Sequence, residues 1–330
     1  MHVDYLCFIG AMYCITDIFF ELKSNHILHI IFLCSLLATL ILFVIVIRFK
    51  LKNNFNRFSL LNNELSKENS ELQLKNKELL ASIRYASSIQ KSFFSVELDL
   101  QKLIPDSFFL FKPRDIVSGD FLWTFVKGDK IFIALADCTG HGVPGAIVSI
   151  IANAVISNAV DFVTDDSPAS ILNKMHKDIN KFFGNKDDSL MLKEGLDIGL
   201  CSIDKNNYML KYSGAYSSLF KINNGDLVEY KGAKKSVGYA KSNFEMEFYD
   251  DIIKYSIDDV FYLSTDGYMD QFGGPFGKKF KQRRFKSLIM KLSSFPMSRQ
   301  KKELEKTLNE WKSGYDQIDD ISVIGFAPFK

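Results

Sequence analysis

Three stretches with different hydrophobic patterns divide the chain. Residues 27–47 contain no Asp, Glu, Lys or Arg, residues 51–92 are rich in Asn, Glu, Lys and Ser, and the remainder alternates short apolar runs with polar turns. An uninterrupted apolar stretch of about 20 residues is long enough to cross a bilayer core as a helix. We therefore predict a membrane anchor in residues 1–50, a polar helix in residues 51–92 and a globular domain in residues 93–330.

The flanks of the apolar stretch predict its orientation. Four cations follow it closely: Arg48, Lys50, Lys52 and Arg57. The positive-inside rule then places the globular domain in the cytoplasm, at the cytoplasmic membrane. A buried core helix is the alternative for residues 27–47. An earlier apolar stretch, residues 5–20, contains Asp17 and is expected to form a short first span, with a signal-like or interfacial segment as the other interpretations.

Apolar residues recur at every seventh position of the polar helix, at Leu51, Phe58, Leu65, Leu72, Leu79 and Ala86. A seven-residue repeat of this length favours a parallel coiled coil, which predicts a homodimer through residues 51–92. The second seam position is occupied by polar residues, namely Glu68, Lys75 and Ser82, so the pairing is expected to be weak and able to shift. A single solvated linker helix is the alternative.

The globular domain has an α+β pattern. We predict strands at residues 130–136, 197–203, 208–213, 219–222, 227–230, 260–265 and 321–326. Helices are predicted at residues 144–160, from Ser167–Pro168 onward, at 283–292 and at 298–312. Strands joined by hairpin turns and followed by helices indicate antiparallel sheets covered by helices. His176, on the polar helix after Pro168, is expected at the surface.

Composition narrows the function classes. The chain has 41 Lys and Arg against 39 Asp and Glu, a net charge of +2, and 47% hydrophobic residues. Such a chain is neither disordered nor basic enough to suggest a nucleic-acid partner. None of the five cysteines forms a C-x-x-C pair, so neither a disulfide framework nor a zinc site is expected, and a reducing compartment fits.

Aspartates lie at the ends of three predicted strands and of the strand-like run FLWTFV. Asp120 precedes FLWTFV, Asp137 follows KIFIALA, Asp266 follows VFYLST, and Asp319–Asp320 precede ISVIGF. Any one of them could be a turn former. Together they suit Mg²⁺ or Mn²⁺, which prefer oxygen ligands, and adjacent glycines let the backbone approach such ions closely.

A family resemblance rests on six ordered motifs, which read KPRDIVSGDFLW (112–123), ADCTGHGVPGA (136–146), GLDIGLCSID (195–204), YSGAYSSLF (212–220), STDGYMDQFGG (264–274) and DDISVIGF (319–326). Over residues 85–330 the chain resembles the SpoIIE-type branch of the PP2C (PPM) protein serine/threonine phosphatases, and within it the bacterial membrane-linked group. The resemblance implies a PP2C-like αββα sandwich, in which two antiparallel sheets are flanked by helices and a two-metal site lies at one edge.

The resemblance also implies roles for individual residues. Two Mn²⁺ or Mg²⁺ ions would be bridged by Asp137, and the backbone carbonyl of Cys138 would be a further ligand. Asp266 and Asp319 would hold the first ion, while Asp120 would serve the second, directly or through water. The expected catalytic set is therefore Asp120, Asp137 and Asp266.

Two further roles stay open at this point. Arg114 is expected to contact the substrate phosphate, with Lys112 as a second candidate and a solvated surface pair as the alternative. His141 is either a general acid or a turn residue near the site. It lies four residues after Asp137, and by motif register Thr139 takes the position of the histidine in the wider family.

The function expected from this resemblance is that of a membrane-anchored, metal-dependent phosphatase that hydrolyses phosphoserine or phosphothreonine with an activated water. The implied substrate is a phosphorylated regulatory protein such as an anti-sigma-factor antagonist. A catalytically silent scaffold of a membrane signalling complex and a small-molecule phosphohydrolase are the alternatives. Residues 273–284, which include five Lys or Arg, are either a substrate-facing loop or a plain solvated loop.

Overall fold

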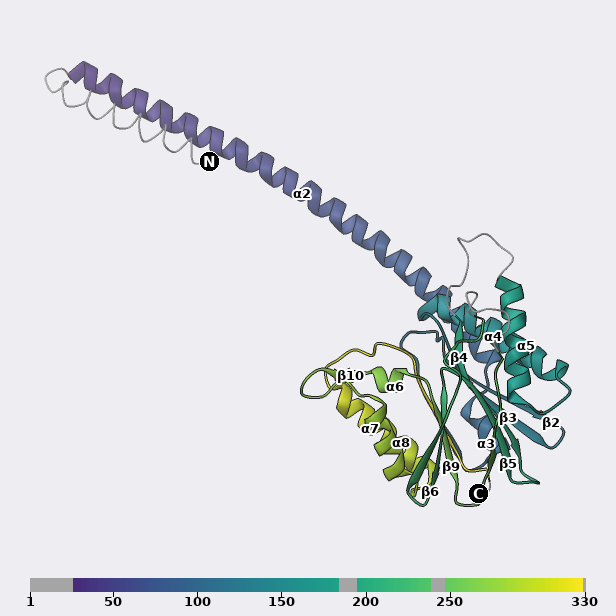
Figure 1. Cartoon of the computed structure of the whole chain (residues 1–330). Coiled ribbons are helices and arrows are strands. Elements are labelled where there is room, and N and C mark those ends of the chain that lie inside the picture. Colours follow the sequence, from purple (N-terminus) through teal and green to yellow (C-terminus); the bar gives the residue numbers. More distant parts are fainter. Residues whose placement is uncertain (1–25, 184–194, 239–246, 329–330) are drawn as a thin grey trace. The chain divides into compact units, whose positions relative to one another are not determined.

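The computed structural model describes residues 26–183, 195–238 and 247–328 (Figure 1). The predicted short span at residues 5–20 lies outside the described residues. The chain divides into two units, residues 1–78 and 79–330, and each is described by itself.

The first unit is dominated by helix α2, which runs from His26 to Phe93 and continues into the second unit. It joins the predicted apolar and heptad segments without a break, as expected of a stretch that contains no Pro or Gly. Its apolar part is largely exposed, and by length and composition it could cross a membrane. Helix α4 (Gly142–Phe162) is also long and apolar enough, but it packs within the domain.

The second unit is an αββα sandwich, which confirms the predicted fold class. One five-stranded sheet has the order β1-β12-β9-β6-β7 and the other has the order β2-β3-β4-β5-β8, and all neighbouring strands are antiparallel. The strands of the first sheet are β1 (Ser107–Lys112), β12 (Ile321–Phe326), β9 (Val260–Ser264), β6 (Ser218–Asn223) and β7 (Asp226–Lys231). Those of the second are β2 (Phe121–Lys127), β3 (Lys130–Cys138), β4 (Leu196–Asp204), β5 (Met209–Ala215) and β8 (Asp251–Lys254).

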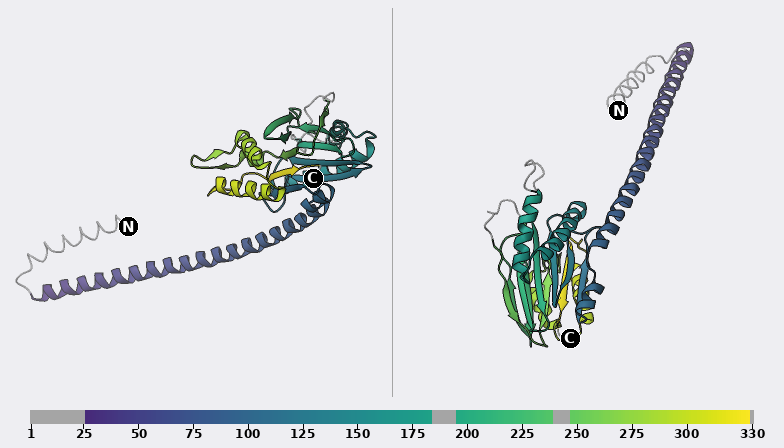
Figure 2. Two further views of the ribbon diagram at one scale, coloured as in Figure 1. Left: turned by 90° about the horizontal axis from the view of Figure 1, so that it is seen from below. Right: turned by 90° about the vertical axis from the view of Figure 1, so that its right-hand side faces the viewer.

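Helices cover both outer faces of the sandwich (Figures 1 and 2). Helices α4 and α5 (Pro168–Phe183) lie on the β3-containing sheet, while α7 (Gln282–Leu292) and α8 (Met297–Lys312) lie on the other. The remaining elements are α3 (Glu97–Leu103), the single-turn helix α6 (Gly267–Asp270) and a small hairpin of β10 (Phe272–Gly273) and β11 (Lys278–Lys279).

Strand alternation explains the layers. In β3, residues 131, 133 and 135 pack between the two sheets, while residues 132, 134 and 136 pack against α4 and α5. In β12, residues 324 and 326 face the other sheet, while residues 321 and 323 face α7 and α8. Because successive side chains of a strand point to opposite faces, strands buried on both faces read as continuous apolar runs. This is the pattern that KIFIALA and ISVIGF show in the sequence.

Local chemistry fixes the ends of the predicted elements. Asn224 and Gly225 form a two-residue turn with positive φ at both positions, which closes the β6–β7 hairpin. The Ser167 hydroxyl accepts a hydrogen bond from the Ser170 backbone N–H and caps α5 as predicted. The placement of His176 at the surface was wrong. Its ring is buried, and its Nδ1 accepts a hydrogen bond from the Gly238 backbone N–H.

Candidate active site

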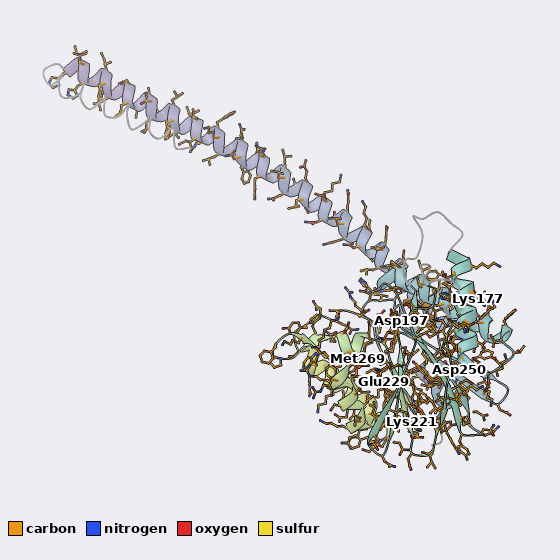
Figure 3. All side chains as sticks on the ribbon, in the orientation of Figure 1. Lys177, Asp197, Lys221, Glu229, Asp250 and Met269 are labelled. Carbon is orange, nitrogen blue, oxygen red and sulfur yellow. The ribbon has the colours of Figure 1, made fainter. Side chains whose placement is uncertain are left out.

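Two aspartates face each other across the second sheet. Asp137, the second-last residue of β3, lies directly opposite Asp197 of β4 in the antiparallel pairing. Alternate residues of a strand point to the same face, and both aspartates are in step with the residues of β3 and β4 that point between the sheets. Their carboxyl groups therefore share that face. Asp197 lies at one end of the sandwich, and Lys221 lies at the other (Figure 3).

The first sheet brings two more aspartates to the same end. Asp266 directly follows Thr265 at the end of β9, and Asp319 lies just before β12. The Thr265 N–H donates to the Ser322 carbonyl (3.1 Å), and the Ser322 N–H donates to the Thr265 hydroxyl (3.1 Å). This pairing holds the end of β9 beside the start of β12, so that carboxylates from both sheets converge.

A cavity of about 340 Å³ lies where they converge. It is lined by Asp137, Cys138, Thr139, Gly140, His141, Gly195, Asp197, Ser236, Asp266 and Asp319. The structure thus brings together four of the five predicted metal-site residues. His141 is on the wall of the cavity, and its Nδ1 lies 3.5 Å from Asp115 Oδ2.

The fifth predicted residue, Asp120, is buried and does not line this cavity. It lines a separate hollow of about 490 Å³, together with Gln90 and Ser118. Its Oδ2 accepts a hydrogen bond from the Thr265 hydroxyl (2.8 Å), whereas its Oδ1 has no partner of normal geometry. Gly119 makes the tight approach possible, because a Cβ there would lie 2.8 Å from the Cys138 carbonyl oxygen and 2.9 Å from that of Gly140. Any larger residue would push the Asp120 segment away from the turn that follows β3.

The electrostatics of the site are those of crowded carboxylates. Burial and the nearby Asp120 and Asp266 raise the pKa of Asp137 well above its ordinary value. Burial and Asp319 raise the pKa of Asp266 to about 6. Burial and the Asp320 carboxylate raise the pKa of Asp120 to about 8, although the neighbouring Ser322 and Thr265 hydroxyls oppose the rise. Each shift arises because negative charges are held close together away from water.

This donor set fits hard divalent cations. Carboxylate oxygens, a strand-end carbonyl and an unpaired buried Asp120 oxygen are the ligands that Mg²⁺ and Mn²⁺ prefer, and positive charge would relieve the repulsion. Among the described residues, no three His, Cys, Asp or Glu groups lie close enough to hold an ion as they stand. Coordination would therefore draw the carboxylates closer together than in this structure.

Residues next to the predicted ligands have supporting roles. Asp320 is buried, and its carboxylate accepts hydrogen bonds from the backbone N–H groups of Arg114 (2.7 Å) and Gly119 (2.8 Å). The Arg114 guanidinium donates to the Ile318 carbonyl (2.9 Å), and Lys112 pairs with Glu305. Neither cation lines the carboxylate cavity.

Asp197 is the cavity carboxylate that sequence reasoning missed. Its Oδ1 accepts a hydrogen bond from the Ser236 hydroxyl (2.6 Å), and burial raises its pKa. The signal was present, because Asp197 interrupts an otherwise apolar strand within one of the six motifs. Only the register with Asp137, however, shows that it belongs to the site.

The last turns of α2 are tied to the segment that carries Asp120. The Gln90 amide nitrogen donates to the Ser118 carbonyl (2.6 Å) and to the Ser149 hydroxyl (3.0 Å), and its oxygen accepts from the Ser118 N–H (3.1 Å). Gln90 is 4% exposed. Gln90 of the polar helix thus holds Ser118, which lies two residues before Asp120.

Comparisons with known proteins relate this fold to a known family. Residues 127–327 match the family model of Stage II sporulation protein E (SpoIIE). The SiaA-PP2C domain of Pseudomonas aeruginosa is 31% identical, with a TM-score of 0.69 over 76% of this chain and 98% of that one.

Two more distant structures share the fold. A Bacillus subtilis SpoIIE structure, with the PP2C phosphatase domain and a fragment of the regulatory domain, is 13% identical, with a TM-score of 0.54 over 67% of this chain and 62% of that one. The RsbU and RsbW domains of Rv1364c from Mycobacterium tuberculosis are 16% identical, with a TM-score of 0.55 over 68% and 60%. No curated protein matches the sequence. The family model and the SiaA likeness show that this chain belongs to the SpoIIE family of PP2C-type phosphatase domains.

Proposed function

We propose that the chain is a membrane-anchored, metal-dependent protein serine/threonine phosphatase that acts on a phosphorylated regulatory protein. Family membership supports the coarser statement, a serine/threonine phosphatase in signalling. The single observation that supports metal dependence is the convergence of Asp137, Asp197, Asp266 and Asp319 on one cavity, with the buried Asp120 close to Asp137.

The proposed metal ligands are Asp120, Asp137, Asp266, Asp319 and the carbonyl of Cys138. Bound Mn²⁺ or Mg²⁺ would supply positive charge for a phosphate dianion and would acidify a water. The chain's own carboxylates hold the site negative, so they would repel a phosphomonoester until that charge is neutralised. The catalytic members are Asp120, Asp137 and Asp266, and Arg114 remains the predicted phosphate contact.

The nucleophile is proposed to be water. Cys138 is the one cysteine on the cavity among the described residues, and its thiol is buried, with its pKa raised further by Asp137. A thiol that stays protonated is a poor nucleophile. No phosphoenzyme intermediate is therefore expected.

The anchor and the dimer are proposed from α2. The exposed apolar segment at residues 27–47 has the length of a membrane span, and four cations follow it. The heptad positions are also exposed in the single chain, with Leu65 at 57% and Leu72 at 53%. Burial of such a stripe against a second copy supports a homodimer through residues 51–92.

The proposed substrate class is a phosphorylated anti-sigma-factor antagonist, on the strength of family membership. One of the structural neighbours is named for RsbU and RsbW domains, although at 16% identity that likeness carries the fold alone. The proposed location is the cytoplasmic membrane, with the phosphatase domain in the cytoplasm.

The proposal is tested by incubating the full chain, in a neutral detergent, with a phosphoserine peptide and measuring the phosphate released, with and without Mn²⁺. The variant is Asp266→Asn, and the matched control is Asp161→Asn, which removes an exposed carboxylate at the end of α4. We expect Mn²⁺-dependent turnover that the first substitution abolishes and the control leaves intact. Turnover independent of metal, or turnover that survives Asp266→Asn, would contradict the proposal.

The same assay separates the alternatives. A silent scaffold binds Mn²⁺ or a partner but releases no phosphate from any substrate. A small-molecule phosphohydrolase turns over p-nitrophenyl phosphate but not a phosphoserine peptide. The complete set of site aspartates favours the enzyme over the scaffold.

A further inference from the structure

A second concentration of charge lies away from the carboxylate cavity, on the segment that follows α6. A hollow of about 510 Å³ is lined by Lys278, Lys281, Arg283, Arg284 and Ser287. All five residues are exposed, and no carboxylate is among them. We refer to these five residues as the basic surface.

The cations of the basic surface are not used for internal ion pairs. Within the described residues, Lys278, Lys281 and Arg283 make no salt bridge, whereas the adjacent Lys279 pairs with Asp270 and Lys286 pairs with Glu229. Cations left without a counter-ion around a hollow repel one another and favour an anionic partner.

The basic surface is held in place by the core. The Trp311 indole N–H donates to the carbonyl of Gln271 (3.0 Å), and the Trp311 carbonyl accepts from the Gly274 N–H (2.8 Å). The Arg284 guanidinium stacks over the Trp311 ring at 4.6 Å and donates to the Phe280 carbonyl (3.1 Å). Because these contacts fix the β10–β11 hairpin on α8, a partner would not have to order a loose loop on binding (Figure 1).

An exposed apolar residue lies two positions before Lys278, in the same hairpin. Phe276, in the turn between β10 and β11, is 82% exposed. Aromatic residues and arginine are enriched in protein-docking surfaces, and the two lysines add positive charge that attracts an acidic partner. The chain also reaches this hairpin directly from Asp266 through the single turn of α6.

We propose that the basic surface, together with Phe276, docks an acidic segment of the phosphoprotein substrate. Charge complementarity selects this partner, and the link to Asp266 puts the docking surface on the segment that emerges from the site. The inference rests on the proposed phosphatase function and adds to it a determinant of substrate choice outside the reacting centre.

The test uses the full chain in a neutral detergent with Mn²⁺ and two synthetic phosphoserine peptides. One peptide carries a run of Asp and Glu on a flexible Gly-Ser linker, and the other carries Ser and Gln instead. The variant is Lys278→Glu, Lys281→Glu and Arg283→Glu. The control, with the same change in net charge, reverses three exposed lysines elsewhere: Lys231, Lys291 and Lys302.

We expect the wild type and the control to favour the acidic peptide in kcat/KM by about tenfold or more, with the preference weakened by salt. The triple variant is expected to lose or invert the preference while hydrolysing p-nitrophenyl phosphate at the wild-type rate, which also shows that it is folded. Equal use of both peptides by the wild type, or an unchanged preference in the variant, would overturn docking.

Two other results bear on the proposals separately. A wild-type protein that hydrolyses neither p-nitrophenyl phosphate nor either peptide would refute the phosphatase function itself. Sedimentation with phosphatidylglycerol vesicles that is lost in the triple variant, without any peptide preference, would assign the basic surface to lipid and overturn the substrate proposal.

Discussion

Replacing Asp120 by Asn tests whether the site is an acidic cluster held against its own repulsion. The pKa of Asp120 rises from its ordinary value of 3.8 to about 8 on folding. The folded state thus binds this proton more tightly than the unfolded state, so the contribution of Asp120 to stability is greatest below pH 3.8 and falls as the pH rises toward 8. At pH 7.5 the charge cost of Asp120 amounts to roughly 5 kcal/mol, and at pH 5 to roughly 2 kcal/mol.

The substitution removes this cost but adds another. The Asn oxygen can still accept from the Thr265 hydroxyl, while its NH₂ group takes the position of Oδ1, where no acceptor of normal geometry is found. An unsatisfied buried donor costs about 1–3 kcal/mol. We therefore expect a net stabilisation of about 2–4 kcal/mol at pH 7.5 without metal, and a change near zero or slightly unfavourable at pH 5.

The assay is thermal melting of the full chain in neutral detergent with a chelator, monitored by tryptophan fluorescence. Both tryptophans of the chain, Trp123 and Trp311, lie in the phosphatase domain and report on it alone. The expected gain corresponds to a rise of roughly 4–16 °C at pH 7.5. Mn²⁺ should stabilise the wild type more than the variant. Asp161→Asn should change neither the melting temperature at pH 7.5 nor the stabilisation by Mn²⁺.

A variant that melts at or below the wild-type temperature at pH 7.5, with no difference between the two pH values, would refute this reasoning. The Asp120 carboxyl would then carry no charge cost on folding, and a cation would not be needed to relieve it.

Three further predictions follow from the same contacts. Asp320→Asn should destabilise the domain by about 1.5–3 kcal/mol in the same melting assay, because one of two charge-assisted bonds to backbone N–H groups is lost; an unchanged melting temperature would contradict that role. If His141 protonates the leaving oxygen, His141→Asn should lower kcat on a phosphoserine peptide by about 100-fold or more, but have little effect on p-nitrophenyl phosphate, whose leaving group needs no proton; equal losses would exclude that role. Asn at three seam positions should convert a dimer to a monomer in analytical ultracentrifugation and alter turnover, and unchanged association and activity would rule out a functional coiled coil through Leu65, Leu72 and Leu79.

The fold could be predicted because its signals are local. Strands such as β12 are continuous apolar runs, and the Asn224–Gly225 turn carries its own conformational preference. Elements without such signals were not predicted: β10 and β11 are two residues each and show no periodicity. His176 was misplaced because its helix is polar overall, and its partner Gly238 is far away in the sequence.

The site could be predicted only in part, because which residues belong to it depends on strand register and on distances in the folded chain. Aspartates at strand ends stand out in the sequence, and four of the five predicted ligands line one cavity. Asp197 lies inside a strand, where a polar residue usually faces solvent, and only its pairing with Asp137 reveals it. Asp319 was the predicted ligand of the Asp319–Asp320 pair, and it lines the cavity. The role of Asp320, which accepts from the Arg114 and Gly119 N–H groups, follows from hydrogen bonds that no spacing encodes.

If a change in the pairing of α2 regulates turnover, Gln90 is the contact that would carry that change to the site. A signal passed along α2 has to reach the site through a contact that changes when the helix rotates or slides. The exposed heptad side chains cannot be that contact, because they stay exposed in the single chain. Gln90 can, because a buried amide that satisfies both the N–H and the carbonyl of Ser118 tolerates little rotation or sliding. Ser118 in turn holds Asp120 through a hydrogen bond from the Asp120 N–H to its hydroxyl, and the Asp120 carboxylate would have to join the ligands that line the cavity. A change in helix pairing that rotated the last turn of α2 would break this amide contact before it disturbed the sheets.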